Sequence, residues 1–324
     1  MTKTLGGVYT FEQAQKRLEA FEEFLKAKGI NIEPGTELER CTLNIYDVLY
    51  KHNDYKIQNQ YEDIRPWIRN ILGMNNLIYL LLEIKDHPCI DQTVEHLAML
   101  NEGNPLQNVP TSVIDESSNK IFELLIAAAV MSFSDSIELE SPKAGKSKNP
   151  DILFDFKKEC WGVACKVAHA KKGKTIYDSI EKGIDQIEKS RADKGIVIVN
   201  IKNLIDHDRY WSILNQVDWE AGQPPIFGGY TKEDVAFNHL RIESEKVAQL
   251  IGVDLGAKNM ISTFQGKKSL PAFLFYVSSA CGIVMNKNPI PTQMGFLLSS
   301  TVQEISSDDA NVLDLINQGL QYGV

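Results

Sequence analysis

The sequence has few cysteines, and they are not arranged in pairs. Five are scattered along 324 residues, with no C-x-x-C motif among them: Cys41, Cys89, Cys160, Cys165 and Cys281. An odd number at such spacings predicts neither a disulfide framework nor a zinc site built from cysteine pairs. A reducing compartment, the cytoplasm, is therefore expected.

Long apolar runs are also missing. The longest fully apolar run, Leu124 to Met131, is far shorter than the roughly 20 residues that a membrane-spanning helix needs. The N-terminal stretch MTKTLGGVYTFEQAQ has neither the charged start nor the apolar stretch of a signal peptide. We therefore expect no membrane partner. The hydrophobic content of 43% is enough for one large domain with a full core and a smaller one beside it.

Acidic residues outnumber basic ones over the whole chain, but one segment is rich in lysine. The net charge of −9 argues against a protein that coats nucleic acid over its entire surface. Between Pro142 and Lys174, however, nine lysines stand against only Asp151, Asp155 and Glu159. A solvated lysine surface is one explanation of this segment, and contact with a polyanion is the other.

The periodicity of apolar residues divides the chain into two parts. Residues 10 to about 100 read as amphipathic helices, and residues 101–110 (NEGNPLQNVP) are rich in turn formers and form the best candidate linker. We therefore predict a helical N-terminal region at 1–105 and an α/β domain at 106–324. The helical part is acidic and suits dimerisation, a protein partner or substrate recognition.

The second part alternates between helix and strand patterns. The expected order is a helix at 118–133, strands at 137–139, 151–156 and 160–168, a helix through Ile176 and Ile187, and a buried strand at 195–201. This order predicts a mixed central sheet flanked by helices. Weaker patterns indicate a helix near 243–251, a strand near 272–277 and a final helix near 309–320.

The candidate chemistry begins in the segment NPDILFDFKKECWGVACK, residues 149–166. A hairpin here would bring Asp151 and Lys166 to one edge of the sheet, a pairing suited to a divalent metal and a phosphate. Lys166 lies in an otherwise apolar strand, and burying its charge without an anionic partner is costly. Either it meets Asp151 or a phosphate, or it is an edge-strand lysine whose head group reaches water.

Glu123 is the third candidate, because it is the only charged residue in the apolar helical run Ile121 to Met131. It is either buried and paired or a solvent-facing residue near a helix start, where the helix dipole favours a carboxylate.

These residues together resemble the PD-(D/E)xK nuclease superfamily. The resemblance rests on Glu123 in a helix, Asp151 in a Pro-Asp pair, Lys166 in the following strand, and Gln186 on the next helix. It covers about residues 118–203 and leaves the rest of the chain unaccounted for. It implies a restriction-endonuclease-like fold and metal-dependent hydrolysis of DNA, in preference to RNA, in restriction, phage defence or repair.

The resemblance also implies roles for single residues. Asp151 and the backbone carbonyl of Cys165 would bind Mg²⁺ or Mn²⁺, Glu123 would complete or orient the metal shell, and Lys166 would stabilise the attacking hydroxide or the phosphate charge. Gln186 would contact the phosphate or the metal-bound water. Lys171, Lys172 and Lys174 follow the catalytic strand and would reach backbone phosphates, unless they form an ordinary solvated turn.

One position departs from the family pattern. The acidic residue expected two positions before Lys166 is Ala164. Either another carboxylate, Asp155 or Glu123, takes its place, or the chain is an inactivated variant, or the protein binds nucleic acid without cleaving it. The alternative to a nuclease is therefore a catalytically inactive module that binds nucleic acid or assembles a larger complex. If the missing ligand limits metal binding, Ala164→Glu should raise activity.

Overall fold

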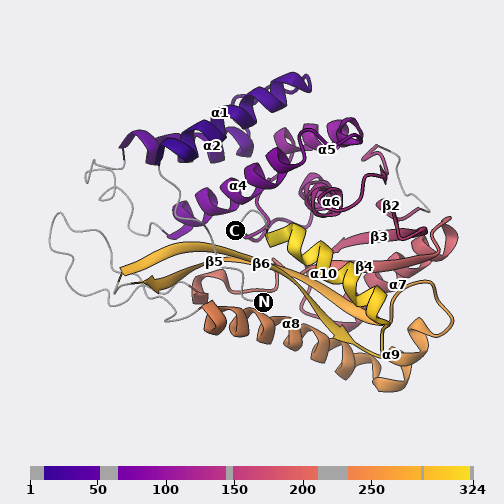
Figure 1. The fold of residues 1–324 in the computed structure, drawn as a ribbon. Helices are drawn as coiled ribbons and strands as arrows, with labels where there is room; N and C mark the ends of the chain where they lie inside the picture. The colour runs from indigo at the N-terminus through magenta and orange to yellow at the C-terminus, as the bar shows by residue number, and fades with distance from the viewer. Residues whose placement is uncertain (1–10, 52–64, 144–148, 211–232, 286–287, 322–324) are drawn as a thin grey trace.

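The computed structural model describes residues 11–51, 65–143, 149–210, 233–285 and 288–321. It shows a mixed α/β protein with a six-stranded sheet flanked by helices (Figure 1). The strands lie side by side in sequence order: β1 (Ile137–Leu139), β2 (Ile152–Phe156), β3 (Glu159–Val167), β4 (Lys194–Asn200), β5 (Ala272–Met285) and β6 (Asn288–Thr301).

The helices expected from the sequence are present with some differences in length, and an additional helix lies at 257–264. They are α1 (Phe11–Ala27), α2 (Glu37–Lys51), α4 (Arg65–Glu83), α5 (Val94–Ala98), α6 (Glu116–Met131), α7 (Gly173–Lys189), α8 (Glu233–Leu255), α9 (Ala257–Phe264) and α10 (Ser307–Gln321). Short 3₁₀ turns are η1 (Ile90–Thr93), η2 (Met99–Asn101) and η3 (His207–Tyr210). Helix α6 begins where Asp115 caps it, accepting the backbone N–H of Ser118 at 2.9 Å.

The sheet combines both strand orientations. Strands β1, β2 and β3 form an antiparallel meander, β3, β4 and β5 run parallel, and β6 returns antiparallel to β5. The parallel pairs need crossover connections: α7 links β3 to β4, and α8 and α9 lie between β4 and β5 in the chain. The carboxyl ends of β3 and β4 therefore share one edge of the sheet with the start of β2.

Two apolar cores lie on opposite faces of the sheet. Alternate residues of β3 divide between them, since Val163 and Cys165 pack with α6 while Ala164 packs with α7. The first core also contains buried side chains of α4 and α10, and the second contains side chains of α7 and α8. In Figure 1, α1 and α2 lie on the outer side of α4, away from the sheet.

The N-terminal helices share the first core with the sheet. Leu18 of α1, Leu38 of α2 and Leu81 of α4 are fully or almost fully buried in the same cluster as Val163. The segment 101–110 is not an exposed linker. Its Leu106, Gln107 and Asn108 are buried.

The buried polar side chains of this segment form hydrogen bonds. Gln107 Oε1 accepts a hydrogen bond from Asn200 Nδ2 at 2.9 Å, and Asn108 Nδ2 donates to Gln293 Oε1 at 2.8 Å. Gln107 and Asn108 therefore bind this segment to the sheet. The division at residue 105 stays a prediction.

The largest addition to the sequence prediction is the long hairpin of β5 and β6. The sequence indicated a strand only near 272–277 and gave no sign of β6, which contains Pro289 and Pro291. A central strand forms hydrogen bonds with a neighbour on each side, and proline lacks the backbone N–H for such a bond. Strand β6 is the edge strand of this sheet, where proline is tolerated.

Candidate active site

The start of β2 and the end of β3 bring Asp151 and Lys166 together. Because the two strands are antiparallel, Asp151, just before β2, lies beside the carboxyl end of β3. Asp151 Oδ2 accepts the backbone N–H of Cys165 at 2.7 Å and lies 3.6 Å from Lys166 Nζ. Asp151 is only 6% exposed, so this ion pair is largely screened from water.

The Lys166 ammonium group is held by two hydrogen bonds in addition to its ion pair with Asp151. It donates to the carbonyl of Cys165 at 3.0 Å and to Gln186 Oε1, on α7, at 2.8 Å. The amide nitrogen of Gln186 in turn donates to the carbonyl of Asn149 at 2.9 Å. The resemblance implies a contact of Gln186 with the phosphate or the metal-bound water, which stays a prediction; in this structure Gln186 fixes the position of Lys166.

Glu123 is buried and paired, not solvent-facing. It lies on α6 with 4% exposure, and Lys120 Nζ bonds to Oε1 at 2.8 Å and to Oε2 at 3.0 Å. His96 Nε2, from α5, lies 3.3 Å from Glu123 Oε2.

Sequence reasoning missed both partners of Glu123. Lys120 stands one helical turn before Glu123, a spacing that predicts contact. His96 is too distant in the chain for its sequence position to reveal the contact.

The two carboxylates share one electrostatic environment. Burial, and secondly the negative charge of Glu123, raise the pKa of Asp151 to about 6, although Lys166 and the Cys165 N–H act in the opposite direction. Burial and the same carboxylates hold the pKa of the Cys165 thiol well above its ordinary value. The thiol is therefore neutral, and the backbone carbonyl is the polar group that Cys165 offers.

The donor chemistry fits a hard divalent cation. Asp151, Glu123 and the Cys165 carbonyl provide oxygen atoms, the ligands that Mg²⁺ and Mn²⁺ prefer. The repulsion that raises the pKa of Asp151 is of the kind that a cation relieves. In the described part of the chain, no three His, Cys, Asp or Glu side chains are grouped so that they could hold a metal ion together. The carbonyl would thus have to supply a ligand beside the two carboxylates.

Of the two carboxylates that could replace the missing acid, Asp155 and Glu123, only Glu123 lies near Asp151. Ala164 is fully buried beneath α7, where a Cβ added at Gly183 would lie 3.2 Å from its methyl group and 2.8 Å from Val197. A small residue is needed there for the helix to approach the sheet. Asp155 pairs with Cys160 at the hairpin end of β2, about 13 Å along the strand from Asp151, and accepts a bond from Ser136. Asp155 therefore does not replace the missing acid.

The lysine-rich segment is not one continuous surface. Lys157 and Lys158 form the β2–β3 turn, at the opposite end of β3 from Lys166. Lys171 and Lys172 are exposed just after β3, at the same end as Asp151, and Lys174 pairs with Asp178 on its own helix. Only part of the segment can therefore face a ligand at this edge. Residues 144–148, with two further lysines, lie outside the described residues.

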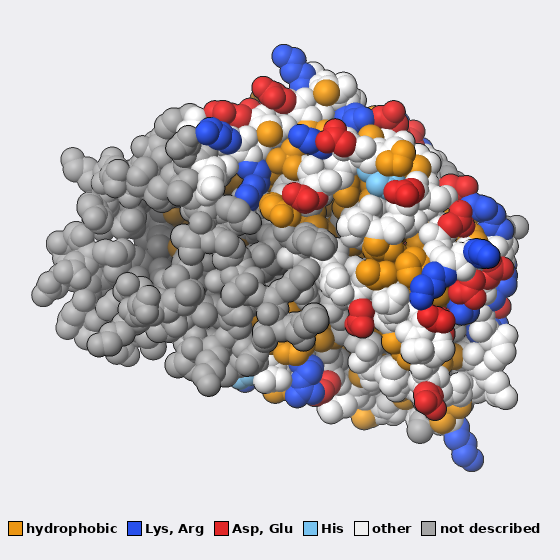
Figure 2. Space-filling model, viewed as in Figure 1, with side chains coloured by type: hydrophobic (Ala, Val, Ile, Leu, Met, Phe, Trp, Pro, Cys, Tyr) orange, Lys and Arg blue, Asp and Glu red, His pale blue; other side chains and the backbone are white. Residues whose placement is uncertain are grey.

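On the face that Figure 2 draws, lysine and arginine side chains are intermixed with aspartate and glutamate. The described part of that face has no broad basic area that would track a nucleic acid backbone.

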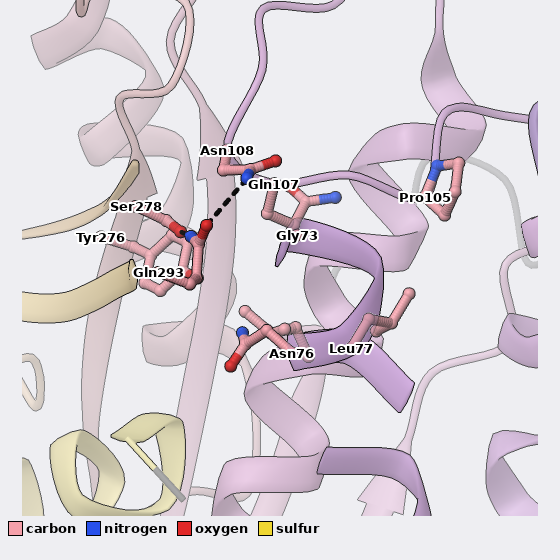
Figure 3. A pocket seen from close by; sticks show the side chains of 10 residues that line it. Gly73, Asn76, Leu77, Pro105, Gln107, Asn108, Tyr276, Ser278 and Gln293 are labelled. Carbon is pink, nitrogen blue, oxygen red and sulfur yellow. Dashed lines mark hydrogen bonds between the residues drawn. The ribbon is translucent and has the colours of Figure 1, made fainter. Parts of the chain in front are cut away.

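Two cavities lie apart from these residues. A cleft of about 470 Å³ is lined by residues 35–37, 101–104 and 110–112 and by Asp115. A second cavity, shown in Figure 3, lies where Gly73 and Asn76 of α4 meet Asn108, Gln293 and neighbouring residues.

The second cavity offers about 10 Å³ for the centre of a water molecule. The oxygens Asn76 Oδ1 and Asn108 Oδ1 have no hydrogen-bond partner among the described residues. This lining suits one bridging water and not a substrate.

Comparisons with protein-family models, with curated proteins and with solved structures found no match to this chain. Among the described residues, no helix is long and apolar enough to cross a membrane. The candidate site therefore rests on its geometry and on the sequence pattern alone.

Proposed function

We propose that this protein is a metal-dependent phosphodiester hydrolase acting on DNA, with a restriction-endonuclease-like α/β domain. The observation that carries the proposal is the buried pair of carboxylates, Asp151 and Glu123, with Lys166 fixed 3.6 Å from Asp151 at the carboxyl end of β3. Two buried carboxylates that repel each other favour the binding of a cation, and the ordered ammonium group beside them favours an anionic substrate. An ordinary surface ion pair has neither property.

The roles of the residues follow from their positions. Asp151, Glu123 and the Cys165 carbonyl would hold Mg²⁺ or Mn²⁺, whose charge neutralises the non-bridging oxygens of a phosphodiester. Lys166, kept in place by Gln186, donates hydrogen bonds to phosphate oxygens as negative charge develops. Lys171 and Lys172, exposed at the same end of β3, would contact neighbouring phosphates and position the strand.

The alternative is a nuclease-like module that binds nucleic acid, or a larger complex, without cleaving. Two observations favour it: Ala164 cannot supply a third carboxylate, and both oxygens of Glu123 are already bonded to Lys120. Such a module would still bind DNA through Lys171 and Lys172, and its affinity would fall steeply with salt.

The first experiment separates these functions. The purified protein is incubated with supercoiled plasmid and with linear duplex, in Mg²⁺, in Mn²⁺ and with a chelator. Asp151→Asn removes the charge but retains an acceptor for the Cys165 N–H, whereas Asp155→Asn makes the same change on the other end of β2.

Cleavage that requires metal, disappears in Asp151→Asn and survives in Asp155→Asn supports the nuclease. Full-rate cleavage by Asp151→Asn refutes the site. No cleavage in any metal, with salt-sensitive DNA binding retained, favours the binding module.

A further inference from the structure

The pairing of Glu123 has a consequence for any cation that enters the site. Lys120 Nζ lies 2.8 and 3.0 Å from the two carboxylate oxygens, so a single ammonium group bridges both of them. His96 Nε2 lies against Oε2 from the other side, at 3.3 Å. The Glu123 carboxylate therefore has no oxygen without a bonding partner.

Lys120 also lies within the electrostatic field of the second carboxylate. The negative charge of Glu123 and, after it, that of Asp151 act on its ammonium group. The ammonium group is thus stabilised by the same groups that would bind a divalent cation. An ammonium group that bridges both oxygens of Glu123 repels a divalent cation that approaches the same carboxylate, so the two cations compete for it.

We propose that Lys120 is a built-in counter-ion of the site, and that a divalent cation binds to Asp151 and Glu123 only by displacing the Lys120 ammonium group from Glu123. This inference rests on the proposed function, because it concerns the metal which that function requires. It assigns to Lys120 control of metal affinity and not a catalytic role.

The surroundings allow this exchange. The Lys120 side chain is 27% exposed and lies one turn before Glu123 near the start of α6, so its head group can move into solvent without unfolding the helix. His96 is almost fully buried and stays against Oε2, which keeps the carboxylate directed while Lys120 leaves. Glu123 is therefore a positioned ligand whose counter-ion is exchangeable.

The test is a calorimetric titration of the full chain with Mn²⁺, without any substrate. Lys120→Met keeps the length of the side chain and removes the charge, while Lys120→Arg keeps the charge. Lys157→Met is the matched control, because Lys157 also pairs with a carboxylate, Asp308, but lies at the opposite end of β3. The double variant Lys120→Met with Asp151→Asn shows whether the measured ion binds at this site.

We expect Lys120→Met to bind Mn²⁺ about tenfold more tightly than the wild type, which corresponds to about 1.4 kcal/mol. Lys157→Met should lie within about twofold of the wild type on the same scale. Lys120→Arg should bind no more tightly than the wild type, and the double variant should lose the gain.

A second readout covers the case in which Lys120→Met is poorly folded without metal. Mn²⁺ should then raise its melting temperature by more than it raises that of the wild type, since stabilisation by a ligand grows with affinity. In the wild type itself, Mn²⁺ should increase the rate at which Lys120 is acetylated by a small acylating reagent, followed by mass spectrometry.

The outcomes separate this inference from the proposed function. Mn²⁺ binding that depends on Asp151 but is equal in Lys120→Met and the wild type, with unchanged Lys120 acetylation, overturns the counter-ion role and leaves the nuclease standing. An absence of Mn²⁺ binding in every variant refutes the metal chemistry and the counter-ion role together.

Discussion

Lys202, at the carboxyl end of β4, gives the stability of this protein a specific dependence on pH. Its side chain is completely buried, and among the described residues its Nζ donates to neutral acceptors alone: Ser118 Oγ at 2.8 Å, Gln107 Oε1 at 3.1 Å and Leu106 O at 3.2 Å. Burial lowers the pKa of Lys202 from 10.5 to about 7, against a weak opposing effect of Asp115. The folded protein therefore holds this proton less tightly than the unfolded chain does.

The sign and size of the effect follow from proton linkage. Between pH 7 and pH 9 the unfolded chain keeps Lys202 protonated, while the folded protein goes from half protonated to nearly neutral. Because the unfolded state then binds more protons, stability rises with pH, at about 1.4 kcal/mol per pH unit for one proton. The contribution of Lys202 to the free energy of unfolding should increase by about 2 kcal/mol over this interval.

Urea unfolding of the wild type and of Lys202→Met at pH 7 and pH 9 measures this contribution. Methionine cannot titrate, so the difference in unfolding free energy between the two proteins should shift by about 2 kcal/mol in favour of the wild type at the higher pH. Lys189→Met, at an exposed position of α7, is the control and should show no such shift. A difference between wild type and Lys202→Met that stays constant from pH 7 to pH 9 would refute the assignment.

Three further predictions concern the site and its supporting helices. Asp151→Asn should abolish cleavage yet stabilise the fold at neutral pH. The pKa of Asp151 is raised from 3.8 to about 6, so the wild type loses stability relative to the variant as pH rises through this range, by about 2.4 kcal/mol between pH 4 and pH 8 in urea unfolding. Ala164→Glu should lower the melting temperature and leave cleavage no higher, because it places a carboxylate between β3 and α7; a more active, equally stable variant would contradict this packing. Gly173→Ala should cost about 1–3 kcal/mol in urea unfolding, because its Cβ would lie 2.1 Å from the Leu250 carbonyl. Gly252→Ala, with only Met260 Sδ at 3.5 Å, should instead stabilise α8 by about 0.5–1 kcal/mol, and equal effects at both glycines would count against the close contact.

Periodic apolar patterns were sufficient to predict the centre of the fold. Ile176, Ile180, Ile184 and Ile187 are all buried on one face of α7, and the apolar run of β4 is covered on both sides. In both elements the local spacing of apolar residues shows which sides are buried, so the sequence alone identifies the element. The β5–β6 hairpin lacked such a signal because the prolines of β6 contradict a strand unless it is known to be an edge.

The candidate site was predictable only in part. The hairpin spacing placed Asp151 near Lys166, because two short antiparallel strands leave few other arrangements. The partners of Glu123 depend on how α5 packs against α6, which no local pattern specifies. Likewise, the position of Ala164 under Gly183 follows from the close approach of α7 to the sheet and cannot be read from the strand alone.

The two hydrogen bonds that hold Lys166 also affect the entropy of substrate binding. A free lysine side chain loses about 1.5–2 kcal/mol of rotamer entropy when it is immobilised. Here the Cys165 carbonyl and Gln186 have already fixed the ammonium group during folding. A phosphate that binds Lys166 therefore does not lose free energy by ordering this side chain. Compared with a mobile lysine at the same place, the gain in affinity or rate is roughly tenfold or more.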